Sequence, residues 1–213
     1  MTLNLVKKAS TIFWDFDGVI KDSVSVKSDA FELLFLPFGD KVAKKVKKHH
    51  EENGGMSRYD KLPIYLNWAG ENSSKELICK FEQKFSQLVK KQVIKSPWVV
   101  GVLEYLQIYY KKQFFFVVTA TPQKEIEDIL EQLQIACYFK QVIGSPTKKN
   151  EALKMLLNKY CIDSRQAIMI GDSDSDYEAA KVNKVKFILR KTELNKKLQK
   201  QLINKTITDF SNG

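Results

Sequence analysis

The stretch FWDFDGVI, residues 13–20, places Asp15 and Asp17 two positions apart at the end of an apolar run that resembles a buried strand. A buried carboxylate without a partner is very costly, so acids at this position indicate a metal, another cation or a strand end open to solvent. A strand terminus closed by an Asp-Gly turn would also explain the pair taken alone. The rest of the sequence decides between these interpretations.

Short apolar runs of this kind recur along the chain and alternate with amphipathic stretches of helical length. The runs lie at residues 11–16, 114–118, 141–144, 167–170 and 185–189, and the helical stretches lie at 98–111, 123–134, 149–160 and 175–182. Continuous apolar runs are typical of central parallel strands that are covered on both faces. The order therefore predicts an α/β fold with a doubly wound, Rossmann-like parallel sheet.

One long segment interrupts this alternation, because it contains helical patterns and no convincing strand. Those patterns lie at residues 24–35, 41–51 and 73–92. We expect residues 23–94 to form an α-helical domain inserted after the first strand. Residues 1–22 and 95–213 would then form the core.

The chain of 213 residues has 35 Lys and Arg against 25 Asp and Glu, which gives a net charge of +10. The densest basic patches are residues 41–50 and 184–205, and a nucleic-acid-binding function would rest on them. Neither patch carries the interleaved aromatic side chains of a recognition module. We therefore interpret them as solvated helix faces and expect no nucleic-acid partner, although a non-catalytic binding protein remains the alternative of a different class.

The cysteines and the hydropathy pattern predict where the protein resides. Cys79, Cys137 and Cys161 are odd in number and widely spaced, so we expect reduced packing residues in a cytoplasmic protein. No segment has the apolar core of a signal peptide or approaches the roughly 20 apolar residues of a membrane span. We expect a soluble protein without a membrane partner, and the sequence gives no oligomeric state.

Polar side chains follow several predicted strands at their carboxyl ends. Asp15 and Asp17 follow the first run, Thr119 follows the second, and Asp172 and Asp176 follow the fourth. Ligands bind at this edge of a parallel sheet, where loops from several strands converge. Oxygen ligands from two strand ends suit a hard cation such as Mg²⁺.

Four segments, in order, carry a resemblance to a known family. FWDFDGVI resembles the DxDGV first motif of the haloacid dehalogenase superfamily, and VVTATPQ (117–123), GSPTKKNEAL (144–153) and GDSDSDYEAA (171–180) are similar to its second, lysine and acidic motifs. The helical insertion after the first motif resembles the cap of the phosphoglycolate phosphatase and β-phosphoglucomutase branch. The resemblance extends over residues 11–180.

The resemblance implies a Mg²⁺-dependent phosphatase that hydrolyses a small phosphorylated metabolite, such as a sugar phosphate or a phosphoglycolate-like acid, through an aspartyl-phosphate. It makes Asp15 the nucleophile and Asp17 the general acid and base. The ligands of Mg²⁺ would be Asp15, the backbone carbonyl of Asp17, and Asp172. Asp176 would be a further ligand or a partner of metal-bound water.

The same motifs imply two phosphate-binding residues. Thr119 would donate its hydroxyl to a phosphoryl oxygen, although a helix N-terminal cap is an alternative role. Lys148 and Lys149 are adjacent, and the spacing from Pro146 in relatives selects Lys149. Asp174 falls outside the matched positions and is interpreted as a solvent-facing residue.

In the predicted cap, GGMSRYDKL (54–62) is similar to the G-x-S-R segment of phosphoglucomutase-type caps. Arg58 would bind a substrate anion, or else lie on a wet helix face. Lys27 occupies a position where mutase relatives carry histidine and would contact a substrate acid group or lie on a helix surface. His49 and His50 are interpreted as a solvated helix end. A phosphomutase remains an alternative function, and the sequence does not name the substrate.

Overall fold

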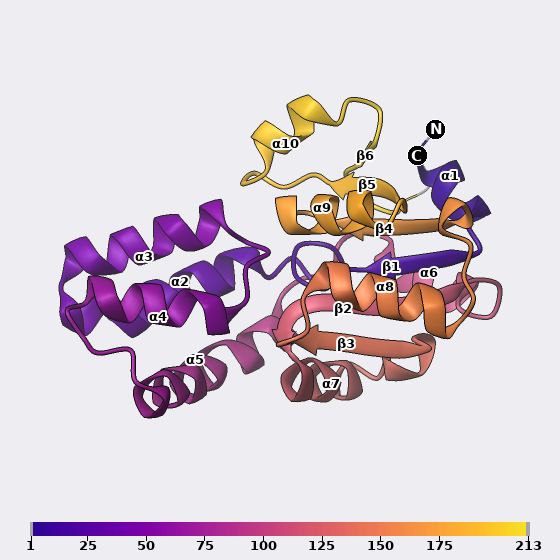
Figure 1. The fold of residues 1–213 in the computed structure, drawn as a ribbon. Helices are drawn as coiled ribbons and strands as arrows, with labels where there is room; N and C mark the ends of the chain where they lie inside the picture. Colours follow the sequence, from indigo (N-terminus) through magenta and orange to yellow (C-terminus); the bar gives the residue numbers. More distant parts are fainter. Residues whose placement is uncertain (1, 212–213) are drawn as a thin grey trace.

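The computed structural model describes residues 2–211 and places six strands in one parallel sheet of order β3-β2-β1-β4-β5-β6 (Figure 1). The strands are β1 (Thr11–Trp14), β2 (Phe114–Pro122), β3 (Gln141–Ser145), β4 (Ala167–Gly171), β5 (Lys186–Arg190) and β6 (Thr206–Ile207). The predicted α/β fold with a parallel sheet is confirmed. Strand β2 extends four residues beyond its predicted end, and the short strand β6 was not predicted.

Helices cover both faces of the sheet, because side chains of the central strands alternate between two apolar layers. Phe13 and Phe116 face the layer formed with α8 (Lys149–Lys159) and α9 (Asp174–Val182). Trp14 and Phe115 face the layer formed with α6 (Val102–Tyr109) and α7 (Gln123–Gln132). The continuous apolar runs in the sequence follow from this burial on both faces.

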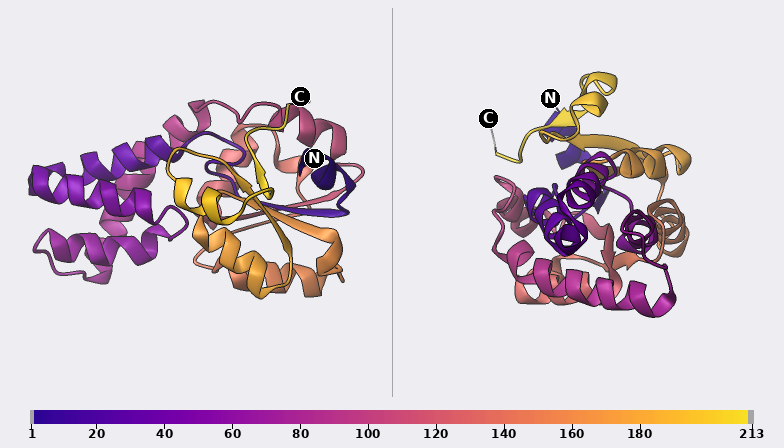
Figure 2. Two further views of the ribbon diagram at one scale, coloured as in Figure 1. Left: turned by 90° about the horizontal axis from the view of Figure 1, so that it is seen from above. Right: turned by 90° about the vertical axis from the view of Figure 1, so that its left-hand side faces the viewer.

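Four further helices form a separate group beyond the carboxyl ends of the strands (Figures 1 and 2). They are α2 (Val24–Phe35), α3 (Asp40–Glu52), α4 (Arg58–Trp68) and α5 (Lys75–Lys95). Helix α4 was not predicted, and Ser57 caps it by accepting a hydrogen bond from the backbone N–H of Asp60 at 3.3 Å. We propose residues 23–94 as the cap and the remaining residues as the core, since these helices lie apart from the sheet. The terminal helices α1 (Thr2–Lys8) and α10 (Lys196–Gln201) were also not predicted.

Strand register brings the predicted site residues to one edge. Trp14, the last residue of β1, pairs with Val117 of β2 and with Ile170 of β4, so β1 ends beside the end of β4 while β2 continues to Pro122. The chain then continues from all three strands toward the cap helices (Figure 1). The edge that faces the cap is therefore the place where the motif residues meet.

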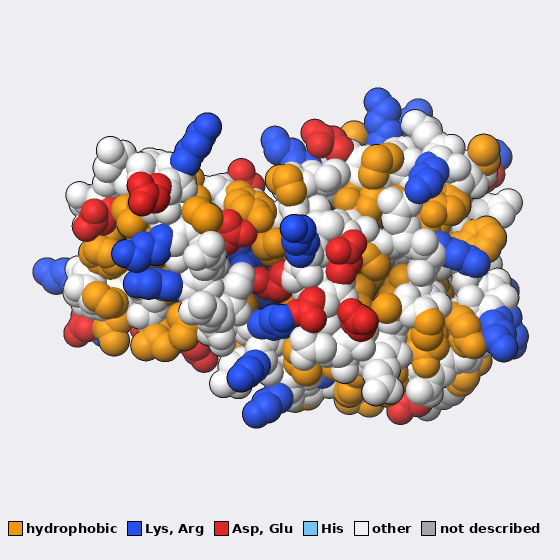
Figure 3. All heavy atoms as spheres, turned by 90° about the horizontal axis from the view of Figure 1, so that it is seen from below, with side chains coloured by type: hydrophobic (Ala, Val, Ile, Leu, Met, Phe, Trp, Pro, Cys, Tyr) orange, Lys and Arg blue, Asp and Glu red, His pale blue; other side chains and the backbone are white. Residues whose placement is uncertain are grey.

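The surface bears on three further predictions. Cys79, Cys137 and Cys161 are unpaired, as expected, but all three are exposed, so the prediction that they are packing residues is wrong. Lys and Arg side chains are scattered over the face in Figure 3 and form no single patch there. Among the described residues, no helix has the length and apolar character needed to cross a membrane.

Candidate active site

Asp15 lies directly after β1 and is 5% exposed. Its backbone N–H donates to the carbonyl of Ile170 at 2.9 Å, which fixes the chain at the sheet edge. Its Oδ1 accepts from the backbone N–H of Phe16 at 2.8 Å, and its Oδ2 accepts from Lys149 Nζ at 2.8 Å. Burial and the negative charge of Asp176 outweigh this lysine and raise the pKa of Asp15 to about 7.

Lys149 begins α8 and is 7% exposed, whereas the neighbouring Lys148 is exposed. The Lys149 Nζ donates to Asp15 and also to Asp176 Oδ1, the latter at 2.6 Å. Burial would lower the pKa of Lys149, but the charges of the two carboxylates outweigh it and raise that pKa. The structure thus brings Lys149 rather than Lys148 to the acidic edge.

Three carboxylates form a cluster there, since oxygen atoms of Asp15, Asp172 and Asp176 all lie within 4.8 Å of one another. Asp176 is fully buried, and its Oδ2 accepts from the N–H and the hydroxyl of Ser173 at 3.2 and 2.5 Å. No described side chain donates to the carboxylate of Asp172, and burial and the charge of Asp15 raise the pKa of Asp172 well above its ordinary value. One ammonium therefore faces three acids.

This donor set fits a hard divalent cation. Carboxylate oxygens are the ligands that Mg²⁺ takes in proteins, and a divalent ion would offset the two negative charges that Lys149 leaves unbalanced. Asp15, Asp172 and Asp176 would hold it. Gly18 permits the close approach, because its φ is +75° and a Cβ there would lie 2.1 Å from Asp172 Oδ2.

The side chain of Asp17 lies outside this cluster and turns toward the cap. Its Oδ1 accepts from Ser23 Oγ at 2.6 Å, and its Oδ2 accepts from Thr121 Oγ1 at 3.0 Å and from Lys27 Nζ. Burial alone would raise the pKa of Asp17, but Lys27 and the two hydroxyls hold that pKa below its ordinary value. The two acids of the first motif thus have opposite electrostatic environments.

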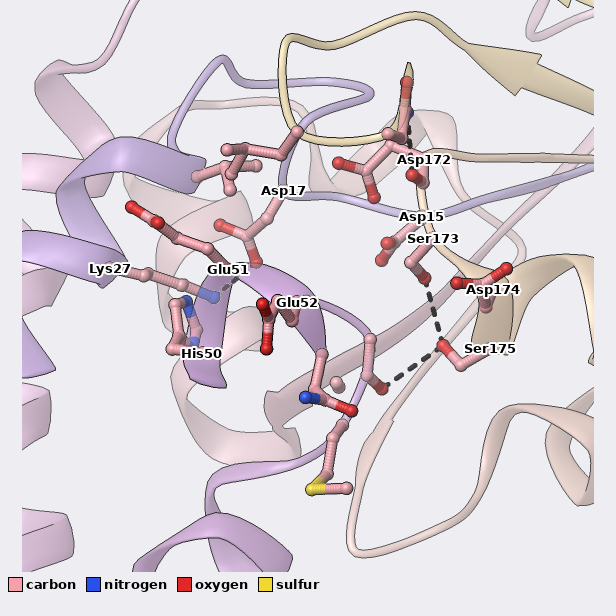
Figure 4. Close-up of a pocket in the computed structure, with 18 of the residues that line it drawn as sticks. Asp15, Asp17, Lys27, His50, Glu51, Glu52, Asp172, Ser173, Asp174 and Ser175 are labelled. Atoms are coloured by element: carbon pink, nitrogen blue, oxygen red, sulfur yellow. Dashed lines mark hydrogen bonds and ion pairs between the residues drawn. The ribbon is translucent and has the colours of Figure 1, made fainter. Parts of the chain in front are cut away.

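A cavity of about 670 Å³ lies between the core edge and the cap. Its core wall includes Asp15, Asp17 and Asp172, and its cap wall includes Lys27 and His50. Figure 4 shows Asp15 and Asp172 near each other, Asp17 turned toward the ammonium of Lys27, and the His50 ring beside Lys27. A small ligand in this cavity would touch both parts of the chain.

A family model described as haloacid dehalogenase-like hydrolase matches residues 12–190. The chain belongs to this family. The match includes all four motif segments, from the acids after β1 to the acidic turn before α9.

Individual relatives agree with this assignment. A phosphoglycolate phosphatase of Vibrio cholerae is 38% identical over 81 residues, which is 36% of this chain and 36% of the relative. A phosphorylated carbohydrates phosphatase of Thermotoga maritima is 24% identical over 180 residues, 80% of this chain and 79% of the relative. The crystal structure of a predicted phosphoglycolate phosphatase from Haemophilus somnus covers 95% of each chain with a TM-score of 0.73 and 17% identity, which shows the shared fold. The comparisons support the predicted enzyme class, a phosphomonoester hydrolase of this family.

Thr119 lines the cavity from β2 and is 2% exposed. Helix α7 begins four residues later, after Pro122, so Thr119 is not its N-terminal cap. Its Oγ1 accepts from the backbone N–H of Thr121 at 3.3 Å. Thr119 is therefore placed as the family motif implies, and its phosphate-binding role stays a prediction.

Arg58 is 5% exposed and does not lie on a wet helix face. Its Nη1 and Nη2 donate to the two carboxylate oxygens of Glu125 in α7, at 2.8 and 2.5 Å, and Nη1 also donates to Ser86 Oγ at 2.6 Å. The pair joins the cap to the core. The charge of Arg58 is thus already matched, and its predicted role in substrate recognition stays untested.

Several residues in or near the cavity were assigned no functional role from the sequence. Ser23 and Thr121 both donate to Asp17, and the position of Thr121 two residues beyond Thr119 in β2 is a signal that could have identified it. His50 is 5% exposed, so its interpretation as part of a solvated helix end is wrong. Its spacing from the buried Ala43 and Val46 matches one face of α3 and could have revealed this.

Asp174 and Lys27 were both assigned from the sequence, and the structure places each of them. Asp174 is exposed, in agreement with its solvent-facing interpretation, although it lies at the cavity. Lys27 turns inward, with its ammonium on Asp17 and on Thr121 Oγ1 at 2.8 Å, so it is not an ordinary helix-surface lysine. Its contact with substrate stays a prediction.

Proposed function

We propose that this chain is a Mg²⁺-dependent phosphatase that hydrolyses a small phosphorylated metabolite, a sugar phosphate or a phosphoglycolate-like acid, through an aspartyl-phosphate. The observation that carries the proposal is the position of Asp15, which contacts Lys149 and lies in a cluster of three acids at the wall of one cavity. The cavity of about 670 Å³ is of the size that small ligands occupy.

In the first step, a carboxylate oxygen of Asp15 attacks phosphorus, and the bond from phosphorus to the leaving oxygen breaks. Lys149 and Thr119 bind the phosphoryl oxygens, and Mg²⁺, when bound, neutralises charge on the same group. Asp17 passes a proton to the leaving oxygen. The ammonium of Lys27, which donates to Asp17 Oδ2, is the adjacent proton source.

In the second step, water attacks phosphorus and the bond to Asp15 breaks, which releases phosphate. Asp17 takes the proton from this water, and that proton restores the ammonium of Lys27. The lowered pKa of Asp17 suits this step, because an ionised carboxylate can accept a proton. The raised pKa of Asp15 is consistent with a nucleophile that needs a cation beside it to stay ionised at neutral pH.

The test is a screen of phosphorylated metabolites and p-nitrophenyl phosphate for release of inorganic phosphate in the presence of Mg²⁺. We expect turnover that EDTA abolishes, and we expect Asp15→Asn to lower kcat by about a thousandfold or more. Unchanged phosphate release by Asp15→Asn would refute the nucleophile assignment. Full activity in EDTA would refute the metal dependence.

A phosphomutase is the runner-up, and its support was the resemblance of the segment that contains Arg58. The bidentate contact of Arg58 with Glu125 weakens that support, because the guanidinium is not free for a second phosphate. A hexose monophosphate separates the two functions. A phosphatase releases free phosphate from it, whereas a mutase converts it to an isomer.

A further inference from the structure

Four cationic side chains that are wholly or largely buried line the cavity, and one of them differs from the rest. Lys149 contacts two carboxylates, Arg58 contacts Glu125 and Lys27 contacts Asp17. Lys61, in α4, is fully buried, and no described carboxylate lies within ion-pair distance of its Nζ. A buried ammonium without a counter-ion is unfavourable, so this position requires an explanation.

The partner of Lys61 is His50. The Lys61 Nζ lies 2.8 Å from His50 Nδ1. An ammonium can only donate, so the imidazole accepts at Nδ1 and carries its own proton at Nε2. Among the described residues, Nε2 has no acceptor, and the His50 ring lies at the cavity wall. The pair therefore offers a positive charge and a free N–H donor.

The surroundings strengthen the effect of this charge. The Phe31 ring lies 4.8 Å from the His50 ring and 3.9 Å from the Phe85 ring, measured between centroids, and both phenylalanines also line the cavity. An anion in such an apolar environment interacts more strongly with a cation than it does in water. Burial and the charges of Lys27 and Lys149 lower the pKa of Lys61 to about 7, so an anion beside Lys61 would favour its charged form.

Other charged groups near the pair do not supply that anion. Glu51 and Glu52 line the same cavity, but neither forms an ion pair with Lys61 within the described chain. Lys21 offers a contrast, since it is also buried without a carboxylate. Its Nζ donates to the carbonyl of Ile94 at 3.0 Å and lies 4.3 Å from the centre of the Trp98 ring, and it does not line the cavity. Lys21 thus has a carbonyl acceptor and a close aromatic ring outside the cavity, whereas the Lys61 Nζ lies at the cavity, 6.0 Å from the centre of the Phe31 ring, with His50 as its hydrogen-bond partner.

We propose that Lys61 and His50 form a subsite for a second anionic group of the substrate, a carboxylate or a phosphate other than the one that is cleaved. The inference rests on the proposed function, because the reacting phosphate would lie at Asp15 in the same cavity. Lys61 supplies the charge and His50 Nε2 donates the hydrogen bond. The substrate class is then a phosphorylated molecule with two anionic groups.

The test compares probes with one and with two anionic groups. The one-anion probe is p-nitrophenyl phosphate, and the two-anion probes are phosphoglycolate, which has a carboxylate, and fructose bisphosphate, which has a second phosphate. We expect Lys61→Met and His50→Gln to raise KM for at least one two-anion probe by about tenfold. They should leave kcat/KM for p-nitrophenyl phosphate within about twofold, and Lys61→Arg should retain part of the selectivity.

The matched control is Lys21→Met, which removes a buried lysine outside the cavity and should change no KM. Thermal melts of all variants show which of them are folded. Equal losses on both probe types, or an unchanged KM for both two-anion probes, would overturn the subsite. The probe that loses affinity identifies the second group as carboxylate or phosphate.

Binding separates this inference from the proposed function. The Asp15→Asn variant is titrated with the two-anion probes by calorimetry, with and without Lys61→Met. If the wild-type chain turns over no probe, the phosphatase proposal fails, but weaker binding after Lys61→Met still supports the subsite. If neither probe binds more tightly to the chain with Lys61 than to the chain with Met, the subsite is refuted.

Discussion

The core wall and the cap wall of the cavity each contain a buried lysine, but only the lysine of the core wall is in contact with described carboxylates. Lys149 in the core lies between the carboxylates of Asp15 and Asp176, at 2.8 and 2.6 Å. Lys61 in the cap contacts the imidazole of His50 and forms no ion pair with a described carboxylate. The core thus surrounds its lysine with carboxylates, whereas the cap holds a cation without a described carboxylate, which a ligand anion could match. Under the two proposals above, the core wall carries out the chemistry and the cap wall determines substrate selectivity.

The largest expected effect is on the core wall, at the adjacent lysines. Lys149→Met removes the only described cation that contacts Asp15, so we expect kcat to fall by about a thousandfold. Lys148→Met is the matched control, because Lys148 is exposed and should leave kcat within about twofold. Steady-state kinetics with p-nitrophenyl phosphate measures both. Equal losses of kcat in Lys149→Met and Lys148→Met would refute the assignment of Lys149, rather than Lys148, to the catalytic edge.

The second prediction concerns Asp172, whose replacement by Asn should raise the stability of the metal-free chain but lower its activity. Burial raises the pKa of Asp172 well above its ordinary value, so its ionisation costs more in the folded state than in the unfolded state. That cost is present at neutral pH and disappears as the pH falls toward the unfolded pKa of about 4. Metal-free Asp172→Asn should therefore melt at a higher temperature than wild type at neutral pH.

The same variant should lose metal-dependent activity. We expect kcat to fall by about a hundredfold and the thermal shift caused by Mg²⁺ to shrink. Melting curves with Mg²⁺ and with EDTA, at neutral and at acidic pH, measure these effects. A lower melting temperature for metal-free Asp172→Asn at neutral pH would show that the three acids do not repel one another as described.

The third prediction concerns the ion pair that joins the two walls. Arg58→Met leaves the carboxylate of Glu125 buried without a partner, so we expect a loss of about 3 kcal/mol in the free energy of unfolding. The double variant Arg58→Met with Glu125→Leu removes both charges and should recover much of this loss. Denaturant titration of the single and double variants measures the coupling. Additive losses would mean that the two side chains do not interact.

The smallest effect is expected at the loop where cap and core touch. Ser175 Oγ donates to the backbone carbonyl of Gly55 at 3.2 Å. A Cβ added at Gly55 would lie 1.8 Å from Ser175 Oγ. Gly55→Ala should therefore displace the cap and raise KM a few-fold, or roughly 1 kcal/mol. Gly54→Ala is the control, since no atom lies within 4 Å of its added Cβ. Equal KM values for the two variants would exclude this contact from substrate binding.

The sequence predicts the core wall better than the cap wall, for a physical reason. Strands buried on both faces appear in the sequence as continuous apolar runs. The carboxyl ends of parallel strands lie at one edge of the sheet, so residues that directly follow such runs, as Asp15, Thr119 and Asp172 do, can be placed there from the sequence. Lys149 is separated from Lys148 only by spacing from Pro146. The structure agrees with each of these placements.

The cap contacts depend on helix packing between distant segments. Arg58 meets Glu125 across 67 positions, and no local pattern marks that pairing. His50 ends a lysine-rich stretch that has the composition of a solvated face, yet neighbouring cap helices bury it. Tertiary packing, rather than the composition of α3, determines its environment.

The proposed function requires Asp15 to form a covalent phosphoryl intermediate. The most direct measurement is rapid acid quench of the Mg²⁺-loaded chain during turnover of radiolabelled p-nitrophenyl phosphate, followed by peptide mapping. We expect a hydroxylamine-labile label on the peptide that contains Asp15, and no label on the Asp15→Asn variant. Phosphate release by an Asp15→Asn variant as fast as by wild type, or a label on another residue, would contradict it.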